Sequence, residues 1–115
     1  TWHVEYTDQF GDWWSGLAEG QQDDLTASVE LLAEFGPQLP FPHSSGIEGS
    51  RHGHMRELRV KGLRVFYAFD PRRTAILLIG GDKTGDGRFY EKFVPLADDL
   101  YDAYIEEIRK EGLIT

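Results

Sequence analysis

The stretch Met55-Arg-Glu-Leu-Arg-Val-Lys-Gly-Leu-Arg-Val-Phe-Tyr-Ala-Phe-Asp-Pro-Arg-Arg-Thr-Ala-Ile-Leu-Leu-Ile-Gly-Gly-Asp-Lys83 decides the fold. It predicts three strands, at 55–61, 63–70 and 74–83, because it is rich in β-branched and aromatic residues. Short turn signals at Lys61-Gly62 and Pro71-Arg72-Arg73 separate them. Connections this short join antiparallel neighbours, and the second and third strands have apolar residues on both faces. We therefore expect a mainly antiparallel sheet with those two strands at its centre.

The flanking residues predict one more strand and three helices. Residues 3–6 alternate as a short opening strand, and Thr7 or Asp8 can cap a helical turn after it. A longer helix is expected over 21–35, a loop over 37–54 and a last helix over 95–111. The positions expected to face inward are Phe10, Trp13, Trp14 and Leu17, then Leu25, Val29, Leu32 and Phe35, and finally Leu96, Leu100, Tyr104, Ile105 and Ile108.

The resulting order, β-α-α-β-β-β-α, predicts the fold class. It is typical of an α+β domain, here with a four-stranded sheet packed by helices. A chain of 115 residues fits one domain, over residues 1–115, and can bury a core without staples. We find no signal peptide and no apolar run long enough to span a membrane, and we expect a cytoplasmic protein.

Charge is segregated along the chain. Residues 1–50 contain nine acids and no Lys or Arg, residues 51–92 contain ten bases and five acids, and residues 93–115 contain six acids and two bases. The net charge of −8 alone argues against a nucleic-acid partner, but the basic block indicates contact with a polyanion.

Several kinds of site are excluded or disfavoured. The absence of cysteine excludes disulfides, thiolate zinc sites and a cysteine nucleophile. The segment Gly80–Thr84 lacks the glycine spacing of a P-loop, and Asp82 and Asp86 do not supply a calcium loop. The three histidines of the 37–54 loop lack a fourth ligand at a recognised spacing. We therefore expect no metal and no cofactor.

Basic side chains and one tyrosine gather in the strand region. Arg64 shares a strand face with apolar residues, so its guanidinium needs a partner, with Glu57 or Asp82 available, or a polar concavity. For Arg59, an ion pair with Glu57 and a functional site are both open, because residues two apart on a strand share a face. The predicted site residues are Arg64, Lys83 and Tyr90, with Arg56, Arg59, Arg72, Arg73, Arg88 and Lys92 as phosphate-binding residues.

Such a set can cleave RNA without a metal. The RNA's own 2′-hydroxyl attacks the adjacent phosphorus, while Arg and Lys stabilise the charge that develops on the phosphoryl oxygens. A tyrosine with a lowered pKa can serve as acid or base, and we expect neighbouring cations to lower the pKa of Tyr90.

Ordered motifs across nearly the whole chain resemble the phage-derived, HigB-like branch of the RelE/ParE toxin superfamily. They are Met55-Arg-Glu-Leu-Arg-Val, Arg64-Val-Phe-Tyr-Ala-Phe-Asp-Pro-Arg-Arg, Ile79-Gly-Gly-Asp-Lys-Thr-Gly and Arg88-Phe-Tyr-Glu-Lys. The resemblance implies a RelE-like fold and a ribosome-dependent mRNA endonuclease that inhibits translation. It also implies a helix-turn-helix, HigA-like antitoxin partner, with operator DNA bound through the toxin–antitoxin complex.

Carried over by position, the resemblance gives roles to individual residues. Arg64 is similar to the family's phosphate-binding arginine, Lys83 to the basic residue after the last strand, and Tyr90 to the aromatic acid or base. Arg59 matches a basic strand position. Met55 and Glu57 stand where some relatives have lysines. The acidity of the chain predicts weaker ribosome binding than in basic relatives.

Two other functions remain open at the level of sequence. A ParE-like inhibitor of DNA gyrase would keep the fold and need no catalytic groups. A catalytically weak co-repressor that works with its antitoxin would fit the absence of lysine at positions 55 and 57.

Overall fold

Three antiparallel strands form the centre of the computed structural model, which describes all residues, 1–115. They are β3 (Arg56–Val60), β4 (Leu63–Phe69) and β5 (Ala75–Asp82). β4 pairs with both neighbours and is almost wholly buried, as the apolar residues on both of its faces predict. Lys61 turns the chain between β3 and β4 with a positive φ of 56°. The predicted α+β fold class is confirmed.

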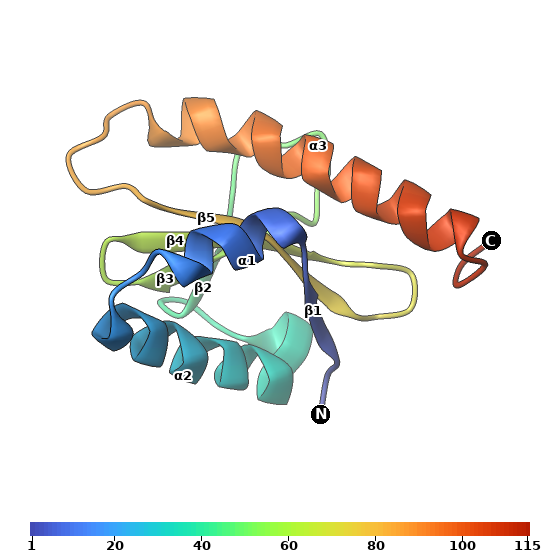
Figure 1. Cartoon of the computed structure of the whole chain (residues 1–115), viewed down its shortest axis with the longest axis horizontal. Coiled ribbons are helices and arrows are strands. Elements are labelled where there is room, and N and C mark those ends of the chain that lie inside the picture. The colour runs from blue at the N-terminus through green and yellow to red at the C-terminus, as the bar shows by residue number, and fades with distance from the viewer.

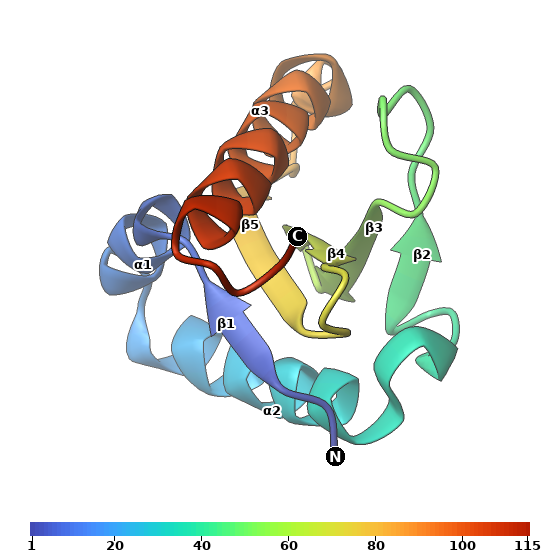
Figure 2. The ribbon, with the colours of Figure 1, turned by 90° about the vertical axis from the view of Figure 1, so that its right-hand side faces the viewer.

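Two short edge strands complete a five-stranded sheet of order β1-β5-β4-β3-β2 (Figures 1 and 2). β1 (Val4–Tyr6) pairs with β5 in parallel, and β2 (Ser44–Gly46) pairs with β3 antiparallel. The four-stranded sheet expected from the sequence omitted β2, because Ser-Ser-Gly has low β propensity. Tertiary contacts hold this strand, since Ser44 Oγ meets Tyr67 Oη at 2.5 Å and accepts a hydrogen bond from Arg56 Nε.

Helices cover both faces of the sheet. On one face lie α1 (Asp8–Ser15) and α2 (Glu19–Phe35), followed by a 3-10 turn (Gly36–Gln38), and on the other lies α3 (Phe89–Lys110) (Figure 2). Thr7 caps α1, as predicted, because its Oγ1 accepts a hydrogen bond from the Phe10 amide. No helix is both apolar enough and long enough to cross a membrane.

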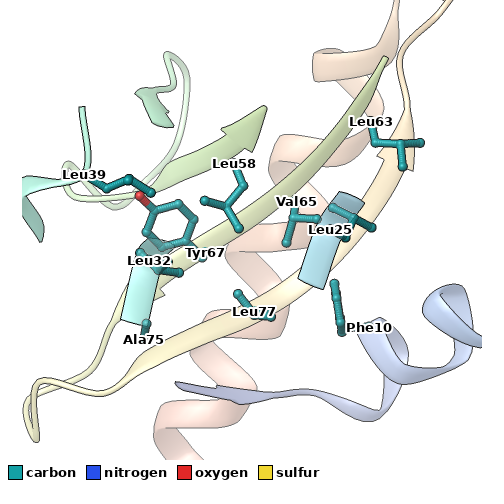
Figure 3. Packing of buried hydrophobic residues seen from close by; sticks show 10 residues of the cluster. All are labelled: Phe10, Leu25, Leu32, Leu39, Leu58, Leu63, Val65, Tyr67, Ala75 and Leu77. Atoms are coloured by element: carbon teal, nitrogen blue, oxygen red, sulfur yellow. The ribbon is translucent and has the colours of Figure 1, made fainter. Parts of the chain in front are cut away.

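Each layer has its own hydrophobic core. The core beneath α1 and α2 is drawn in Figure 3, where Tyr67 and Val65 of β4 meet Leu32 and Leu25 of α2. The core beneath α3 contains Phe66 of β4. Consecutive β4 residues thus enter opposite cores, which is the alternation expected of a central strand.

Consecutive glycines let helices approach both faces of β5. A Cβ on Gly80 would overlap the Trp13 ring of α1, and a Cβ on Gly81 would come within 2.8–3.0 Å of the Phe93 and Phe89 rings of α3. Any other residue at these positions would push a helix away from the sheet.

The helix boundaries and faces contain three corrections. α3 begins at Phe89, six residues before the expected start, so Pro95 lies inside the helix rather than at its first turn. Leu96, expected to face inward, is 42% exposed, and Val94, Ala97 and Tyr101 are the buried residues on the inward face. Phe35, expected to face inward, is 45% exposed at the end of α2.

The loop that follows β2 is held against α3. Ser50 Oγ and the Arg51 amide donate hydrogen bonds to the buried carboxylate of Asp98 at 2.5 and 2.9 Å. His52 Nε2 lies 2.8 Å from Asp102 Oδ1. His52, Asp98 and Asp102 thus anchor the loop to α3. No group of histidines and acids in the structure is arranged to hold a metal ion.

Candidate functional site

Glu57 of β3 lies at the centre of a buried polar cluster on the sheet face that α3 covers. Only 3% of this residue is exposed. Its Oε1 accepts a 2.8 Å hydrogen bond from the Tyr90 hydroxyl of α3 and lies 3.8 Å from Arg64 Nε of β4. Its Oε2 lies 3.6 Å from Arg59 Nη1. We call these four residues, Glu57, Arg59, Arg64 and Tyr90, the Glu57 cluster.

The sheet register explains why these side chains meet. Glu57 and Arg59 are two residues apart on β3 and share a face, and Arg59 pairs directly with Arg64 of β4. Of the two partners expected for Arg64, the structure selects Glu57. Asp82 instead accepts a hydrogen bond from the Thr84 amide, and that bond lowers the pKa of the Asp82 carboxyl.

Arg64 is a buried guanidinium that retains a free donor. It is 6% exposed, and its Nη1 donates to the carbonyls of Lys61 and Leu63 at 2.7 and 2.8 Å. Its Nε has no hydrogen-bond partner. A buried donor without a partner costs about 1–3 kcal/mol, so an incoming anionic oxygen would gain from meeting it.

The phenol of Tyr90 has a raised pKa and retains its proton. Burial and the hydrogen bond to Glu57 raise the pKa of the Tyr90 phenol, and the lowering effect of Arg64 does not offset them. The expectation that neighbouring cations would lower this pKa is therefore wrong, because burial disfavours the charged phenolate and the Glu57 carboxylate adds a negative charge beside it. At neutral pH the phenol is a proton donor.

Lys83 lies beside this tyrosine. Its ammonium is 6.0 Å from the centre of the Tyr90 ring, and its amide donates to the Gly62 carbonyl, which holds the end of β5 against the β3–β4 turn. The three predicted catalytic residues, Arg64, Lys83 and Tyr90, therefore lie at one end of the sheet on one face.

Two residues that sequence reasoning did not select complete the surroundings. Glu57 was considered as an ion-pair partner and as a departure from relatives with lysine, although it is the one acid on its strand and shares a face with Arg59. Phe41, from the loop before β2, is 68% exposed, and its ring centre lies 5.2 Å from the Arg59 guanidinium carbon. No local pattern marks Phe41, because its position depends on how the loop crosses the sheet edge.

Three of the predicted phosphate-binding residues do not join the cluster. Arg56 points to the opposite sheet face, because it is one residue from Glu57, and its Nε donates to Ser44 Oγ. Arg72 and Arg73 lie in the turn beyond the far end of β4, and the strand alone separates them from Arg64 by roughly 16 Å. Arg72 binds Asp70 and Glu5, and Arg73 stacks over Trp2 with 4.4 Å to the ring centre.

The two remaining basic residues stay near the cluster but are solvent-exposed. Arg88 precedes α3 and pairs with Glu91 at 2.9 Å, and Lys92 pairs with Asp86 at 2.6 Å. The sequence predicted that the last helix begins at residue 95. Because α3 begins at Phe89, a helix positions Tyr90 and Lys92.

The arrangement suits general acid–base chemistry on a phosphodiester. It holds one carboxylate, one protonated phenol and several cations within a small region, and the groups that it needs all come from the chain. An exposed aromatic ring beside an arginine can stack a splayed nucleobase.

Comparison with known proteins identifies the family of the chain. The profile of a family described as phage derived protein Gp49-like matches residues 12–102, which include the whole Glu57 cluster. The chain is 39% identical over 89 residues to HigB3 of Mycobacterium tuberculosis, a candidate toxin, covering 75% of this chain and 78% of HigB3. HigB2 of the same organism, also a candidate toxin, is 34% identical over 101 residues, covering 83% of this chain but only 50% of HigB2.

A solved structure shares the fold at low sequence identity. The archaeal RelE–RelB complex from Pyrococcus horikoshii contains a chain that matches with a TM-score of 0.60 at 18% identity, covering 76% of this chain and 99% of that one. This likeness confirms a RelE-like fold.

Proposed function

The chain belongs to the Gp49-like family of phage-derived proteins and is similar to HigB3, and from this premise we propose that it is the toxin of a toxin–antitoxin pair. Its activity is metal-independent cleavage of mRNA on the ribosome, which inhibits translation. The names of the HigB relatives support the toxin role, and the complex of the RelE-fold chain with RelB supports a protein partner, which we take to be an antitoxin. We assign that partner to the helix-turn-helix, HigA-like class, which would carry the pair to operator DNA.

One observation carries the proposal of catalysis. A buried carboxylate, a buried arginine with a free Nε and a protonated tyrosine contact one another across β3, β4 and α3. A guanidinium donor that is buried without a hydrogen-bond acceptor destabilises the fold. An ion pair with only a structural role would gain nothing from such a donor. A phosphoryl oxygen would satisfy it.

The chemical step follows from the inventory of the cluster. The substrate 2′-oxygen forms a bond to phosphorus and transfers its proton to the Glu57 carboxylate. The bond from phosphorus to the 5′-oxygen breaks, and the Tyr90 hydroxyl donates a proton to that leaving oxygen. The products are a 2′,3′-cyclic phosphate and a 5′-hydroxyl. Arg64 and Lys83 stabilise the negative charge on the phosphoryl oxygens.

Substrate binding requires the closed cluster to exchange partners. Glu57 is almost fully covered while Tyr90 donates to it, so the phenol must turn from the carboxylate to the leaving oxygen. Arg59 holds the other carboxylate oxygen and keeps Glu57 in place. Phe41 offers its exposed ring to a neighbouring base. Arg88 and Lys92 contribute positive charge for the RNA backbone beside the cluster.

Mapping of cellular RNA 5′ ends after inducing this chain alone tests the proposal. We expect new 5′-hydroxyl ends confined to translated messages, and their loss in Arg64→Lys, which keeps a charge but not the guanidinium geometry. Arg73→Ala is the matched control, because Arg73 is remote from the cluster. Intact transcripts with induction of the DNA damage response would overturn RNA cleavage and favour gyrase inhibition.

A further inference from the structure

A large open groove lies beside β1, on the sheet face opposite the Glu57 cluster. It has a volume of about 1020 Å³ and lies between β1, α1 and α2. Its apolar lining includes Trp2, Tyr6, Trp14, Val29 and Ala33. Tyr6 is 65% exposed. Contiguous exposed apolar surface of this kind marks an interaction site on small proteins.

The charged residues of the groove are all acidic apart from one histidine. Asp8, Asp12 and Glu30 are exposed at its rim, and no lysine or arginine lines it. The elements that form its walls come from the first fifty residues, which contain no Lys or Arg at all. Trp2 in its wall carries the Arg73 guanidinium over its ring, so the remaining exposed rings, such as Tyr6, are the ones open to a partner.

The acidic rim limits the kinds of molecule that could bind in the groove. The acidic rim repels RNA phosphates and the anionic surface of a membrane. A symmetric contact with a second copy would bring the same acids face to face. A polypeptide segment with large apolar side chains flanked by Lys or Arg satisfies both the lining and the rim.

The backbone beside the groove adds a second attachment point. β1 is an edge strand that pairs only with β5, so one edge of Val4–Tyr6 carries backbone groups without strand partners. An extended part of the same segment could pair there, as peptides do with exposed sheet edges.

We propose that this groove binds a basic, amphipathic segment of a protein partner, and that the partner is the antitoxin. The identity of the partner rests on the proposed function, whereas the chemistry of the segment rests on the groove. The segment occupies the face of α1 and α2, so its binding leaves the side chains of the Glu57 cluster uncontacted.

The test measures binding of the purified product of the neighbouring gene to this chain and to matched variants. Asp12→Lys with Glu30→Lys reverses two rim charges, and Asp23→Lys with Glu34→Lys makes the same charge change on exposed α2 positions outside the groove. Tyr6→Ala removes exposed apolar surface from the groove, and Leu113→Ala, which is 49% exposed in wild type, does so elsewhere. Hydrogen exchange maps the protected segments.

We expect the two groove variants to raise Kd at least tenfold and the two controls to change it less than twofold. Protection should fall on β1 and α1. Equal binding by the rim and control charge variants, protection confined to α3, self-association through the groove, or no binding of the neighbouring product would overturn the inference. RNA cleavage by each variant without the partner is recorded separately. If the wild-type chain does not cleave RNA, the proposed function is refuted, but the result on groove binding still holds.

Discussion

The Tyr90 hydroxyl donates a 2.8 Å hydrogen bond to the Glu57 carboxylate and thereby joins the first turn of α3 to the middle of β3. This contact places an acid and a base of opposite protonation state side by side. Burial and the bond to Glu57 raise the pKa of the Tyr90 phenol, so the phenol is protonated at neutral pH and remains the donor of this bond.

Replacing Tyr90 with Phe should reduce RNA cleavage by about 100-fold or more, because it removes the proton donor to the leaving oxygen. The ring and its packing on Phe66 and Phe89 are retained, so the fold should persist. Single-turnover cleavage of a ribosome-bound message measures the change. Wild-type rates in Y90F would remove Tyr90 from the chemistry.

Replacing Glu57 with Gln should reduce cleavage by a similar factor while keeping an acceptor for the Tyr90 hydroxyl. The substitution leaves Arg64 without its buried counter-charge, and losing one partner of a buried pair costs about 3–5 kcal/mol. Urea unfolding therefore accompanies the activity assay, and rates are compared per folded molecule. A variant that is less stable but fully active would show that Glu57 has only a structural role.

Replacing Arg72 with Ala should destabilise the fold without changing cleavage by the folded protein. Arg72 links β1, the β4–β5 turn and α3 through Glu5, Asp70 and the Tyr104 hydroxyl. Charge-assisted hydrogen bonds of this kind contribute about 1.5–3 kcal/mol each. Unfolding midpoints and single-turnover rates separate the two effects. A loss of RNA cleavage at unchanged stability would restore Arg72 to the RNA-binding set.

Replacing Phe41 with Ala should reduce cleavage about tenfold, since base stacking on an aromatic side chain is worth about 1–3 kcal/mol. Phe41→Trp should retain activity and alter the preferred nucleotide beside the cut. Phe35→Ala removes another partly exposed phenylalanine, on α2, and is the control. Identical cleavage maps for all three variants would exclude stacking on Phe41.

Stability should fall as the pH rises through about 10. Burial raises the pKa of the Tyr90, Tyr101 and Tyr104 phenols above their ordinary value of 10.0, and Glu5 raises that of Tyr104 further. A raised pKa means that the folded state holds the proton more tightly than the unfolded state does. The stabilisation is thus complete below pH 10 and lost above it.

Urea midpoints at pH 8, 9.5 and 11 measure this slope. Tyr104→Phe should be less stable at pH 8, because it loses its hydrogen bond to Glu5, and its stability should depend less steeply on pH than that of wild type. A variant with the wild-type slope would assign the loss to other groups.

The local sequence pattern was sufficient to predict secondary structure where the apolar residues follow a single periodicity. The three central strands and the Thr7 cap follow from alternation and turn chemistry, whereas Tyr90 lies beside Arg64 and Lys83 because α3 begins at Phe89. The resemblance to a toxin family came from ordered motifs across nearly the whole chain. Its functional residues are still assigned by proposal, and mutagenesis decides among them.

Tertiary structure decided whatever depends on partners distant in sequence. β2 forms because Ser44 reaches Tyr67 and Arg56, and Arg72 is an anchor because Glu5 and Tyr104 lie beside it. The pKa of Tyr90 rises instead of falling because packing buries the phenol and brings it against a carboxylate 33 residues away in sequence. Sequence alone determined which charges the chain carries and on which strand face they lie. Only the packed fold determined which charges meet, because Coulomb and hydrogen-bond energies depend on distances of a few ångströms.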